Sequence, residues 1–558
     1  DTVIASVSAP DLAVGSDTGA SSSDDITKTT TPAFAGTVEA NARVDLYKDG
    51  ATFVGTANAN GSGAYSVTPS SALTAGTYVF TVKATDPAGN VTAASPGLSV
   101  AIDTTIATPS TPDLDPGSDT GPSATDNPTH DNTPTFTGTA EANSTVKLYK
   151  DGVEVGTATA TGGGTYSVTS SALVSGTYTF MVKATDVAGN VSNDSGGLAV
   201  TIDTVAPATP GQPSLDTLSD TGALGDNITQ DTSPTFNGTV EANATVKLYL
   251  WGAVEYGTAA ANGSGAYSVT ASPALPSGSY FFAVKAIDAA GNVSDPSPSL
   301  SITIDTVAPS QPAAPDLDSA SDTGILNADN ITSDTTPTFT GTVEPNATVT
   351  LYRDGAEVGS TSANGVGAYA VTSFSIGSGT YAFTVKAKDL AGNESIASAG
   401  LSATIDTVAT APVIPDLDTA SDTGSSNLDN ITSDATPTFS GTVEPSAAVN
   451  LYRDGATLVG SATANGSGVY SVTTSAPVSD GVHTFTVTQT DLAGNVSSAS
   501  QALSVTIDTG IVTPGAPDLN AGSDTGRYDW DNVTTNTTPT FSGTTEAGAT
   551  VNLYQDGV

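Results

Sequence analysis

The sequence predicts an all-β fold, organised as a tandem array of small β-sandwich domains. Three observations support this prediction. The tetrapeptide Ser-Asp-Thr-Gly recurs at intervals of 100 to 102 residues, with its Asp at Asp17, Asp119, Asp220, Asp322, Asp422 and Asp524. Within each interval, short segments alternate apolar and polar residues, which is the period of a β-strand. The 3.6-residue period of an amphipathic helix does not appear in the sequence.

A second marker, an Asp-Thr pair after an apolar segment, closes each repeat. Its Asp falls at Asp103, Asp203, Asp305, Asp406 and Asp508. A period of about 100 residues is long enough for a domain with its own core. We therefore expect a linker at 1–8, complete repeats at 9–103, 104–203, 204–305, 306–406 and 407–508, and a partial repeat at 509–558. Since the sequence begins at a closing Asp and stops within a repeat, we expect it to be part of a longer protein.

The second repeat shows the expected strands most clearly, at 133–140, 144–152, 154–160, 164–170, 176–186 and 197–203. In the fifth of these segments, Tyr178, Phe180 and Val182 alternate with polar residues and are expected to face the core. About seven strands per hundred residues predict an immunoglobulin-like sandwich. Pro-rich linkers such as 204–213 predict semi-rigid spacers, so we expect the array to form an extended rod.

A Gly-Thr-Tyr sequence at the start of the sixth strand resembles the tyrosine corner of immunoglobulin-like folds. It recurs at Tyr78, Tyr178 and Tyr381. Tyr280 follows Gly-Ser instead, and the fifth repeat has His483 at this position. The corner is therefore expected in most of the repeats but not in all of them.

The charge of the chain is strongly one-sided, with 57 Asp and Glu against 14 Lys and Arg and a net charge of -43. Such a surface repels nucleic acid and anionic membranes and attracts cations. The chain has no Cys, which excludes disulfides and thiolate metal sites. No run of about 20 apolar residues predicts a membrane span. We therefore expect cations as partners, and neither nucleic acid binding nor membrane insertion by this sequence.

Enzyme chemistry has little support in the sequence. The two His residues, His130 and His483, occupy unrelated positions in their repeats. The chain has no Cys nucleophile, no Gly-x-Ser-x-Gly motif and no phosphate-binding loop. We therefore expect a protein that is not an enzyme.

The segment "PDLDPGSDTGPSATDN" at 112–127 predicts a calcium site within the repeat. Carboxylate, amide and carbonyl oxygens in a tight loop suit Ca²⁺, although Asp, Ser, Gly and Asn also form ordinary solvated turns. Recurrence in every repeat of a chain poor in cations favours calcium. Ser214 replaces the first Asp of this loop in the third repeat, and Ala13 replaces the second in the first. The predicted loop ligands are Asp115, Asp119, Asp126, Asp216, Asp220, Asp226, Asp318, Asp322, Asp329, Asp418, Asp422, Asp429, Asp524 and Asp531.

A second predicted calcium site lies at each joint between repeats. Asp103 closes one domain, while Glu141 and Asp186 follow the second and sixth strands of the next. In an immunoglobulin topology these three positions meet at one end of the sandwich, where three carboxylates repel unless a cation bridges them. The alternative is that Asp-x-Ala-Gly-Asn is only a turn. The equivalent sets are Asp1, Glu39 and Asp86; Asp203, Glu241 and Asp288; Asp305, Glu344 and Asp389; Asp406, Glu444 and Asp491; and Asp508 with Glu546.

The two kinds of site are expected to act separately. The substitution Asp203→Ala should loosen the joint between the second and third repeats and leave both sandwiches folded. The substitution Asp119→Ala should lower local stability more than it changes the angle between repeats.

The phrases "TPTFTGTAEANSTVKLYKDG", "KATDVAGNVS" and "TIDTVAP" resemble the bacterial Ig-like repeats of giant surface adhesins, of the biofilm-associated-protein type exported by type I secretion. The resemblance covers essentially the whole chain. It implies stacked Ig-like domains that form an extracellular stalk stiffened by calcium, and a binding region elsewhere in the protein. By this resemblance, the joint ligands are Asp103, Asp203, Asp305, Asp406 and Asp508.

The expected function is therefore a calcium-stiffened stalk of an adhesin, on a bacterial surface or in a biofilm matrix. Its expected partners are calcium ions and the neighbouring repeats, with further copies of itself or a host or surface ligand bound through regions outside this sequence. Two alternatives stay open. One is a self-assembling extracellular filament or matrix protein, and the other is an array of calcium-dependent carbohydrate-binding modules.

Overall fold

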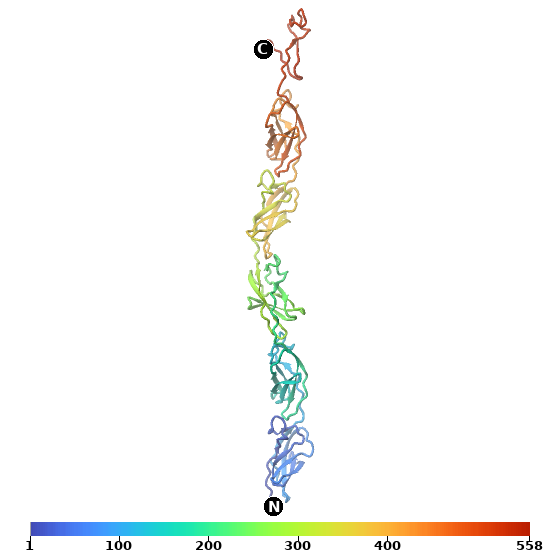
Figure 1. Cartoon of the computed structure of the whole chain (residues 1–558), viewed down its shortest axis with the longest axis vertical. Coiled ribbons are helices and arrows are strands. Elements are labelled where there is room, and N and C mark those ends of the chain that lie inside the picture. The colour runs from blue at the N-terminus through green and yellow to red at the C-terminus, as the bar shows by residue number, and fades with distance from the viewer. Residues whose placement is uncertain (1, 558) are drawn as a thin grey trace. The chain divides into compact units, whose positions relative to one another are not determined.

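The structure, a computed structural model, describes residues 2–557, which form two compact units, 2–306 and 307–557. The first unit contains three repeats, and the second contains two further repeats and the incomplete sixth. Every regular element of the described chain is a β-strand, and Figure 1 shows the strands gathered into one small sandwich per complete repeat. The predicted all-β array of Ig-like sandwiches is thus confirmed. Residues 2–557 contain no helix with the length and apolar character that a membrane crossing requires.

Each complete repeat contains eight strands in the same order. In the first repeat they are β1 (Asp11–Leu12), β2 (Ile26–Thr27), β3 (Phe34–Thr37), β4 (Arg43–Lys48), β5 (Thr52–Asn58), β6 (Ala64–Val67), β7 (Gly76–Thr85) and β8 (Leu98–Ile102). In the second they are β9 (Asp113–Leu114), β10 (Pro128–Thr129), β11 (Thr135–Thr139), β12 (Thr145–Lys150), β13 (Val153–Thr159), β14 (Thr165–Thr169), β15 (Gly176–Thr185) and β16 (Leu198–Ile202). In the third they are β17 (Ser214–Leu215), β18 (Ile228–Thr229), β19 (Thr235–Thr239), β20 (Thr245–Leu250), β21 (Val254–Ala260), β22 (Ala266–Thr270), β23 (Gly278–Ile287) and β24 (Leu300–Ile304).

The second unit repeats this order. The fourth repeat has β25 (Asp316–Leu317), β26 (Ile331–Thr332), β27 (Thr338–Thr342), β28 (Thr348–Arg353), β29 (Ala356–Ser362), β30 (Ala368–Thr372), β31 (Gly379–Lys388) and β32 (Leu401–Ile405). The fifth has β33 (Asp416–Leu417), β34 (Ile431–Thr432), β35 (Thr438–Thr442), β36 (Ala448–Arg453), β37 (Thr457–Thr463), β38 (Val469–Thr473), β39 (Gly481–Thr490) and β40 (Leu503–Ile507). The incomplete sixth repeat has β41 (Asp518–Leu519) and β42 (Phe541–Ser542).

The strands of each complete repeat form two facing sheets. In the second repeat, β9, β11 and β14 make a three-stranded antiparallel sheet, and β10, β16, β15, β12 and β13 make a five-stranded one. The edge strand β10 pairs in parallel with β16, while the other neighbours are antiparallel. The first strand of an Ig-like sandwich is therefore split into two short pieces, β9 and β10, with one piece in each sheet. The acidic loop at 115–127 connects these two pieces.

The core lies between the two sheets. In the second repeat, Phe136 of β11 and Phe180 of β15 are fully buried, and their ring centroids are 4.4 Å apart. Val146, Leu148 and Val182 pack into the same cluster. Burial of one such side chain contributes about 1.5–3 kcal/mol, so this cluster supplies much of the apolar stabilisation within the repeat. Alternate residues of β15 face inward, as predicted from the sequence.

A close tyrosine–glycine contact recurs across the three-stranded sheet. The Tyr166 ring lies over Gly138, its partner in the β11–β14 pairing. A Cβ atom on Gly138 would lie 2.5 Å from the Tyr166 Oη and 2.7 Å from its Cζ, which no side chain can tolerate without a shift. The glycine in the "TFTGT" strand is therefore required by the tyrosine that covers it.

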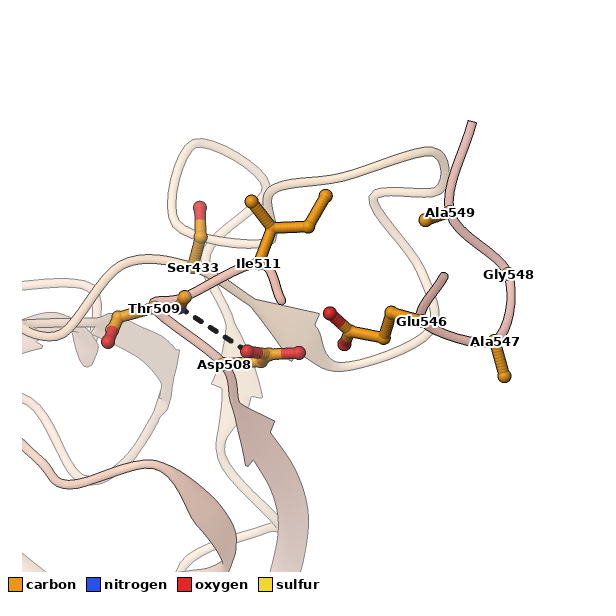
Figure 2. Close-up of a pocket in the computed structure, with 9 residues that line it drawn as sticks. Ser433, Asp508, Thr509, Ile511, Glu546, Ala547, Gly548 and Ala549 are labelled. Atoms are coloured by element: carbon orange, nitrogen blue, oxygen red, sulfur yellow. Dashed lines mark hydrogen bonds between the residues drawn. The ribbon is translucent and has the colours of Figure 1, made fainter. Parts of the chain in front are cut away.

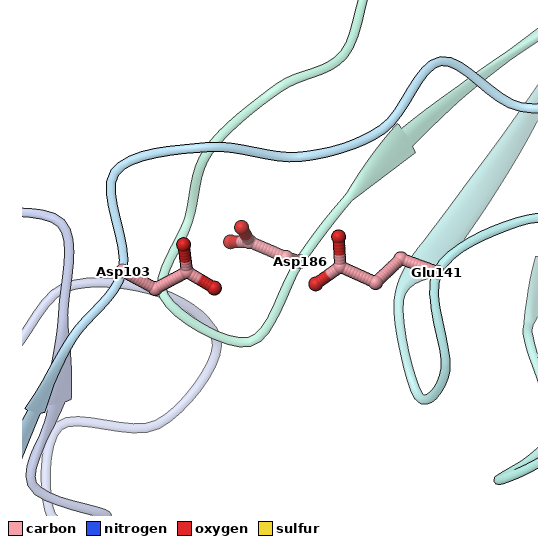
Figure 3. Close-up of side chains that lie close together, drawn as sticks. All are labelled: Asp103, Glu141 and Asp186. Carbon is pink, nitrogen blue, oxygen red and sulfur yellow. The ribbon is translucent and has the colours of Figure 1, made fainter. Parts of the chain in front are cut away.

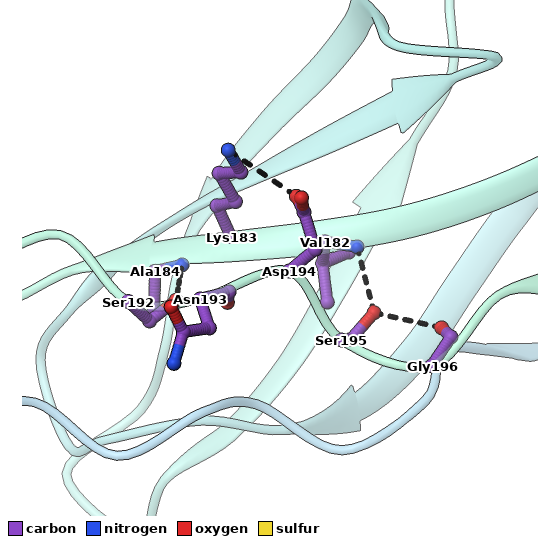
Figure 4. Close-up of polar contacts among 8 residues, drawn as sticks. All are labelled: Val182, Lys183, Ala184, Ser192, Asn193, Asp194, Ser195 and Gly196. Carbon is purple, nitrogen blue, oxygen red and sulfur yellow. Dashed lines mark hydrogen bonds and ion pairs between the residues drawn. The ribbon is translucent and has the colours of Figure 1, made fainter.

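The segment after β15 runs back along that strand and is held to it by serines (Figure 4). The Ala184 N–H donates to the Ser192 Oγ (2.9 Å), and the Val182 N–H donates to the Ser195 Oγ (2.9 Å). The Lys183 Nζ lies 3.3 Å from an oxygen of Asp194 on the surface beside them. These bonds fix both ends of the intervening loop, 186–190.

The tyrosine corner is present in four repeats. The Tyr178 hydroxyl donates to the Val174 carbonyl at 3.0 Å, and Tyr78, Tyr280 and Tyr381 bond in the same way to the residue four positions earlier. In the fifth repeat, the Nε2 of His483 lies 2.9 Å from the Ser479 carbonyl. Histidine therefore takes the place of tyrosine and keeps the contact.

Candidate metal centres at and beside the joints between repeats

Three carboxylates meet at the joint between the first and second repeats. Asp103 directly follows β8, Glu141 lies after β11, and Asp186 follows β15. One oxygen from each lies within 4.8 Å of the others, and Figure 3 shows the three side chains pointing toward a common point. Asp186 is buried, while Asp103 and Glu141 are half-buried. Within either unit of the described chain, no other group of three metal-binding side chains closes to this spacing.

Asn190 holds this arrangement together. Its Nδ2 donates to the Asp186 Oδ2 (2.8 Å) and to the backbone carbonyl of Asp103 (2.9 Å). The Asn190 N–H donates to the Asp186 Oδ1 at 2.7 Å, and Gly189 has a φ of 88°. The Asp-x-Ala-Gly-Asn segment is therefore a turn, as the alternative interpretation stated. The same turn also places Asp186 beside the preceding repeat.

The electrostatics of the group favour a bound cation. Burial raises the pKa of Glu141, and the neighbouring carboxylates of Asp186 and Asp103 raise it further. A backbone hydrogen bond from Ala107 lowers this pKa but does not cancel the increase. Three carboxylates at this distance repel one another unless a proton or a cation intervenes. A donor set made only of oxygens, with no Cys or His, fits Ca²⁺ better than Zn²⁺. The residues present are therefore suited to calcium.

Other joints share part of this arrangement. The Nδ2 of Asn292 donates to the Asp203 carbonyl (2.8 Å), which brings the Asp288 loop to Asp203. Glu241, however, is exposed. The Nδ2 of Asn495 likewise donates to the Asp406 carbonyl at 2.8 Å. The three carboxylates do not close to the first joint's spacing at either of these two joints, both of which lie within a unit.

The acidic residue after the second sandwich strand also binds the linker. The Glu444 Oε1 accepts from the Thr410 N–H (2.8 Å) and Oγ1 (2.6 Å). At the last joint, Glu546 and Asp508 face one another across a cavity of about 400 Å³ (Figure 2). The Asp305, Glu344 and Asp389 set spans the two units and stays a prediction. The set of Asp1, Glu39 and Asp86 also stays a prediction, because Asp1 lies outside the described residues.

The Asp of each Ser-Asp-Thr-Gly motif is buried with one oxygen unpartnered. Asp119 is 7% exposed, and its Oδ1 has no hydrogen-bond partner among the described residues. The same holds for Asp17, Asp220, Asp322, Asp422 and Asp524. Burial raises the pKa of Asp119, and the carboxylates of Asp126 and Asp113 raise it further. A buried carboxylate oxygen without a partner is costly, so this site is suited to a cation.

The surroundings of this Asp are seen most clearly in the fourth repeat. A cavity of about 290 Å³ lies beside Asp322, and its walls include Asp316, Asp318 and Asn330. Asp316, like Asp113 of the second repeat, was not among the predicted ligands. The strand alternation could have identified it, because Asp113 and Asp115 flank the buried Leu114 and so share a face. The third repeat has Ser214 in this place, and the Nδ2 of Asn237 donates to the Asp216 Oδ2 at 2.6 Å.

Several of the predicted loop ligands also form turns, as Asp115 and Asp329 illustrate. The Asp115 Oδ1 accepts from the Gly117 N–H at 2.9 Å, and Asn520 makes the same bond to Gly522 at 3.0 Å. The Asp329 Oδ1 accepts from the Ile331 N–H at 3.1 Å. One oxygen of each carboxylate is thus engaged in a turn. The solvated-turn interpretation therefore describes part of their role, whereas the buried Asp of the Ser-Asp-Thr-Gly motif has no such partner for its Oδ1.

Known proteins share sequence with this chain. A segment of Exoglucanase B from Cellulomonas fimi is 33% identical over 272 residues, which is 47% of this chain and 23% of that protein. The chain therefore matches less than a quarter of the length of this relative.

Known structures also resemble the chain. A tetra-tandem repeat from the extending region of a large adhesion protein is 22% identical, with a TM-score of 0.25 over 72% of this chain and 99% of the other. A Ca²⁺-stabilised adhesin with which an Antarctic bacterium binds ice is 21% identical, with a TM-score of 0.24 over 73% and 100% of the two chains. Likenesses at this level carry no inference about function.

The family model of the bacterial Ig-like domain matches the chain six times in succession. The matched residues are 4–104, 105–204, 207–306, 308–407, 408–509 and 511–557. These matches follow the eight-stranded units of the structure, and the sixth covers the incomplete repeat. The predicted resemblance to bacterial Ig-like repeats is confirmed, and the chain belongs to the bacterial Ig-like domain family.

Proposed function

We propose that these repeats form a calcium-stiffened stalk of an extracellular bacterial adhesin, which holds a distal binding region away from the cell and supports adhesion or biofilm formation. The observation that carries the proposal is the group formed by Asp103, Glu141 and Asp186, which belong to two consecutive repeats and have ligand oxygens within 4.8 Å of one another. A cation bound there would join the two repeats directly. Without a cation, the same charges would push them apart. The protein acts in this proposal as a structural element and not as an enzyme.

Weak binding is expected at these sites. Extracellular modules bind Ca²⁺ with dissociation constants on the order of 10⁻⁴ to 10⁻³ M. An adhesin outside the cell meets calcium in that range, so the stalk would stiffen where it works. Ligand binding to the folded state would also raise the melting temperature as calcium is added.

The test measures flexibility at one joint in the whole chain. Since the chain has no cysteine, the double substitution Ala51→Cys and Ala172→Cys places one spin label on each of the first two repeats. Both positions are exposed. Calcium should narrow the distribution of distances between the labels, and a chelator should broaden it. Small-angle scattering of the same protein in calcium should give a length approaching about 200 Å, as a row of sandwiches with strands of this length would have.

A matched pair of substitutions makes the result specific. Asp103→Asn removes one carboxylate from the joint, and Asp194→Asn removes one from an exposed ion pair with Lys183. With Asp103→Asn, calcium should no longer narrow the distribution of distances between the spin labels. With Asp194→Asn, calcium should narrow that distribution as it does in the parent. If calcium narrows the distribution equally in both variants, the joint site does not exist as proposed.

A further inference from the structure

A second contact between repeats involves the threonine of the Ser-Asp-Thr-Gly motif. The Thr18 Oγ1 donates to the Ala188 carbonyl of the next repeat at 2.6 Å. Thr120 makes the same bond to Ala290 at 2.7 Å. In the second unit, Thr323 makes it to Ala493 at 3.0 Å. Three joints therefore share one hydrogen bond between residues that are 170 positions apart in the sequence.

The glycine of the motif allows this close approach. A Cβ on Gly121 would lie 2.3 Å from the Ala289 carbonyl oxygen, and a Cβ on Gly324 would lie 1.9 Å from that of Leu492. The contacted alanines are buried, with Ala290 3% and Ala188 0% exposed. Ala88 of the first repeat, which has no complete repeat before it in this sequence, is exposed. The burial of this alanine thus comes from the preceding repeat.

At this contact, the acidic loop that holds one candidate cation site meets a loop that carries a predicted joint ligand. On one side, Thr120 directly follows Asp119, whose Oδ1 is buried without a partner among the described residues. On the other side, Ala290 belongs to the loop 288–292, whose first residue is the predicted joint ligand Asp288. The last residue of that loop, Asn292, bonds to the Asp203 carbonyl. The second repeat therefore holds the loop 288–292 at two points. Its acidic loop contacts Ala290 at the centre, and Asp203, which follows β16, contacts Asn292 at the end.

We propose that the threonine and glycine of Ser-Asp-Thr-Gly couple the two cation sites, so that binding at Asp119 in one repeat strengthens binding at the joint with the next repeat. The coupling rests on the proposed function, since it requires both sites to bind calcium. A cation at Asp119 would order the backbone of the acidic loop and so hold Thr120 and Gly121 in place for docking. The docked loop 288–292 would then carry Asp288 already positioned toward Asp203. By thermodynamic linkage, calcium at the joint must strengthen the loop site by the same factor.

The test reads both sites separately in the full chain by hydrogen exchange during a calcium titration. Peptides that cover 113–129 report the acidic loop of the second repeat, and peptides that cover 286–293 report the joint loop of the third. Asp119→Asn should raise the calcium midpoint of the 286–293 peptides about five-fold or more, within the usual range of coupling between sites. The corresponding peptides of the second repeat, 184–191, belong to another joint and should keep their midpoint, which provides an internal control.

Variants of the contact separate coupling from a merely structural effect. Thr120→Val removes the hydroxyl, Thr120→Ser keeps it, and Gly121→Ala blocks the approach to Ala289 while leaving the hydroxyl in place. In proteins that already carry Thr120→Val or Gly121→Ala, adding Asp119→Asn should leave the calcium midpoint of the 286–293 peptides unchanged. In the Thr120→Ser background, it should still raise that midpoint. These double variants test coupling even if the single substitutions alter local stability.

The outcomes distinguish the two proposals. If both sites show calcium-dependent protection, but Asp119→Asn leaves the calcium midpoint of the 286–293 peptides unchanged, the coupling is wrong. The proposal of a calcium-stiffened stalk would still hold. The absence of calcium-dependent protection at every site would overturn the proposed function itself. An equal effect of Asp119→Asn in the parent and in the Thr120→Val background would show that the threonine is not the link.

Discussion

A buried tyrosine in each repeat makes stability depend on pH in the alkaline range. Burial raises the pKa of Tyr65, Tyr166, Tyr267, Tyr369 and Tyr470 to about 12, from an ordinary value of 10. Because the folded state holds the phenol proton more tightly, this stabilisation is complete below pH 10 and is lost as the pH rises through 12. The difference corresponds to at most about 3 kcal/mol per repeat. We expect the melting temperature, followed by circular dichroism, to fall between pH 10 and 12.

Phenylalanine at these five positions provides the control. The ring would still cover the glycine of the neighbouring strand in the same sheet, and the Tyr369 hydroxyl, for example, has no hydrogen-bond partner among the described residues. The fivefold variant should therefore keep its melting temperature to higher pH than the parent. If both proteins lose stability over the same interval, another group is responsible for the alkaline unfolding.

Individual residues were predicted with mixed success for a physical reason. The buried Asp of the Ser-Asp-Thr-Gly motif was among the predicted ligands, because its recurrence in an acidic loop indicated a shared role. Asp113 was not among them, although its carboxylate lies close enough to raise the pKa of Asp119. Asp115 was among the predicted ligands, yet one of its oxygens accepts a hydrogen bond from the Gly117 N–H in a turn. Sequence shows which residues share a loop, but the fold decides which carboxylates point inward.

At the scale of elements, the loop 186–190 depends on one asparagine. Asn190 donates to Asp186 in its own loop and to the Asp103 carbonyl of the preceding repeat. The substitution Asn190→Ala should therefore destabilise the loop by about 1–3 kcal/mol, because buried acceptors lose their donor. Hydrogen exchange of peptides that cover 184–192 should become faster.

Asn193, three positions further along, is the matched control. It is exposed, so Asn193→Ala should leave exchange in 184–192 unchanged. Equal acceleration by the two substitutions would mean that the loop responds to any change in this segment and that Asn190 has no special role.

Elements were predicted well where the alternation of apolar residues was strong. The expected strand at 176–186 is β15 (Gly176–Thr185), and its inward face is as expected because Phe180 and Val182 can be buried only on one side. The division of the first strand into β9 and β10 was not predicted. Each piece has only two residues, which is too short to show a period. Their place in different sheets is set by tertiary pairing.

At the scale of the whole molecule, the net charge of -43 should make the unliganded chain sensitive to salt. Raising NaCl from about 10 mM to 1 M shortens the screening length from about 30 Å to 3 Å and weakens repulsion among carboxylates. In chelator, the melting temperature should therefore rise with NaCl. With calcium in excess the rise should be smaller, since bound cations have already neutralised the closest groups.

The comparison is made by calorimetry of the full chain, with sucrose at the same osmolarity as the control for effects that do not depend on charge. A melting temperature that falls with NaCl in chelator would show that repulsion among carboxylates does not limit stability.

The organisation into repeats was predictable because the spacing of Ser-Asp-Thr-Gly is periodic, but the contacts between repeats were not. Thr18 and Ala188 are 170 residues apart, and neither residue type indicates a partner in another domain. The two kinds of predicted site were therefore treated as independent. The structure instead connects the acidic loop and the joint through one loop of the following repeat.

The joint contacts also have a consequence for how such a protein could evolve. The three joints between complete repeats that lie within a unit use the same repeat positions on both sides, namely the threonine and glycine of one repeat and the Asp-x-Ala-Gly-Asn loop of the next. Unequal recombination between near-identical gene segments could therefore add or remove a whole repeat, and each new junction would have its complementary surfaces already in place. Such a gene could change the reach of its product in steps of one domain, without selection of a new interface at each step.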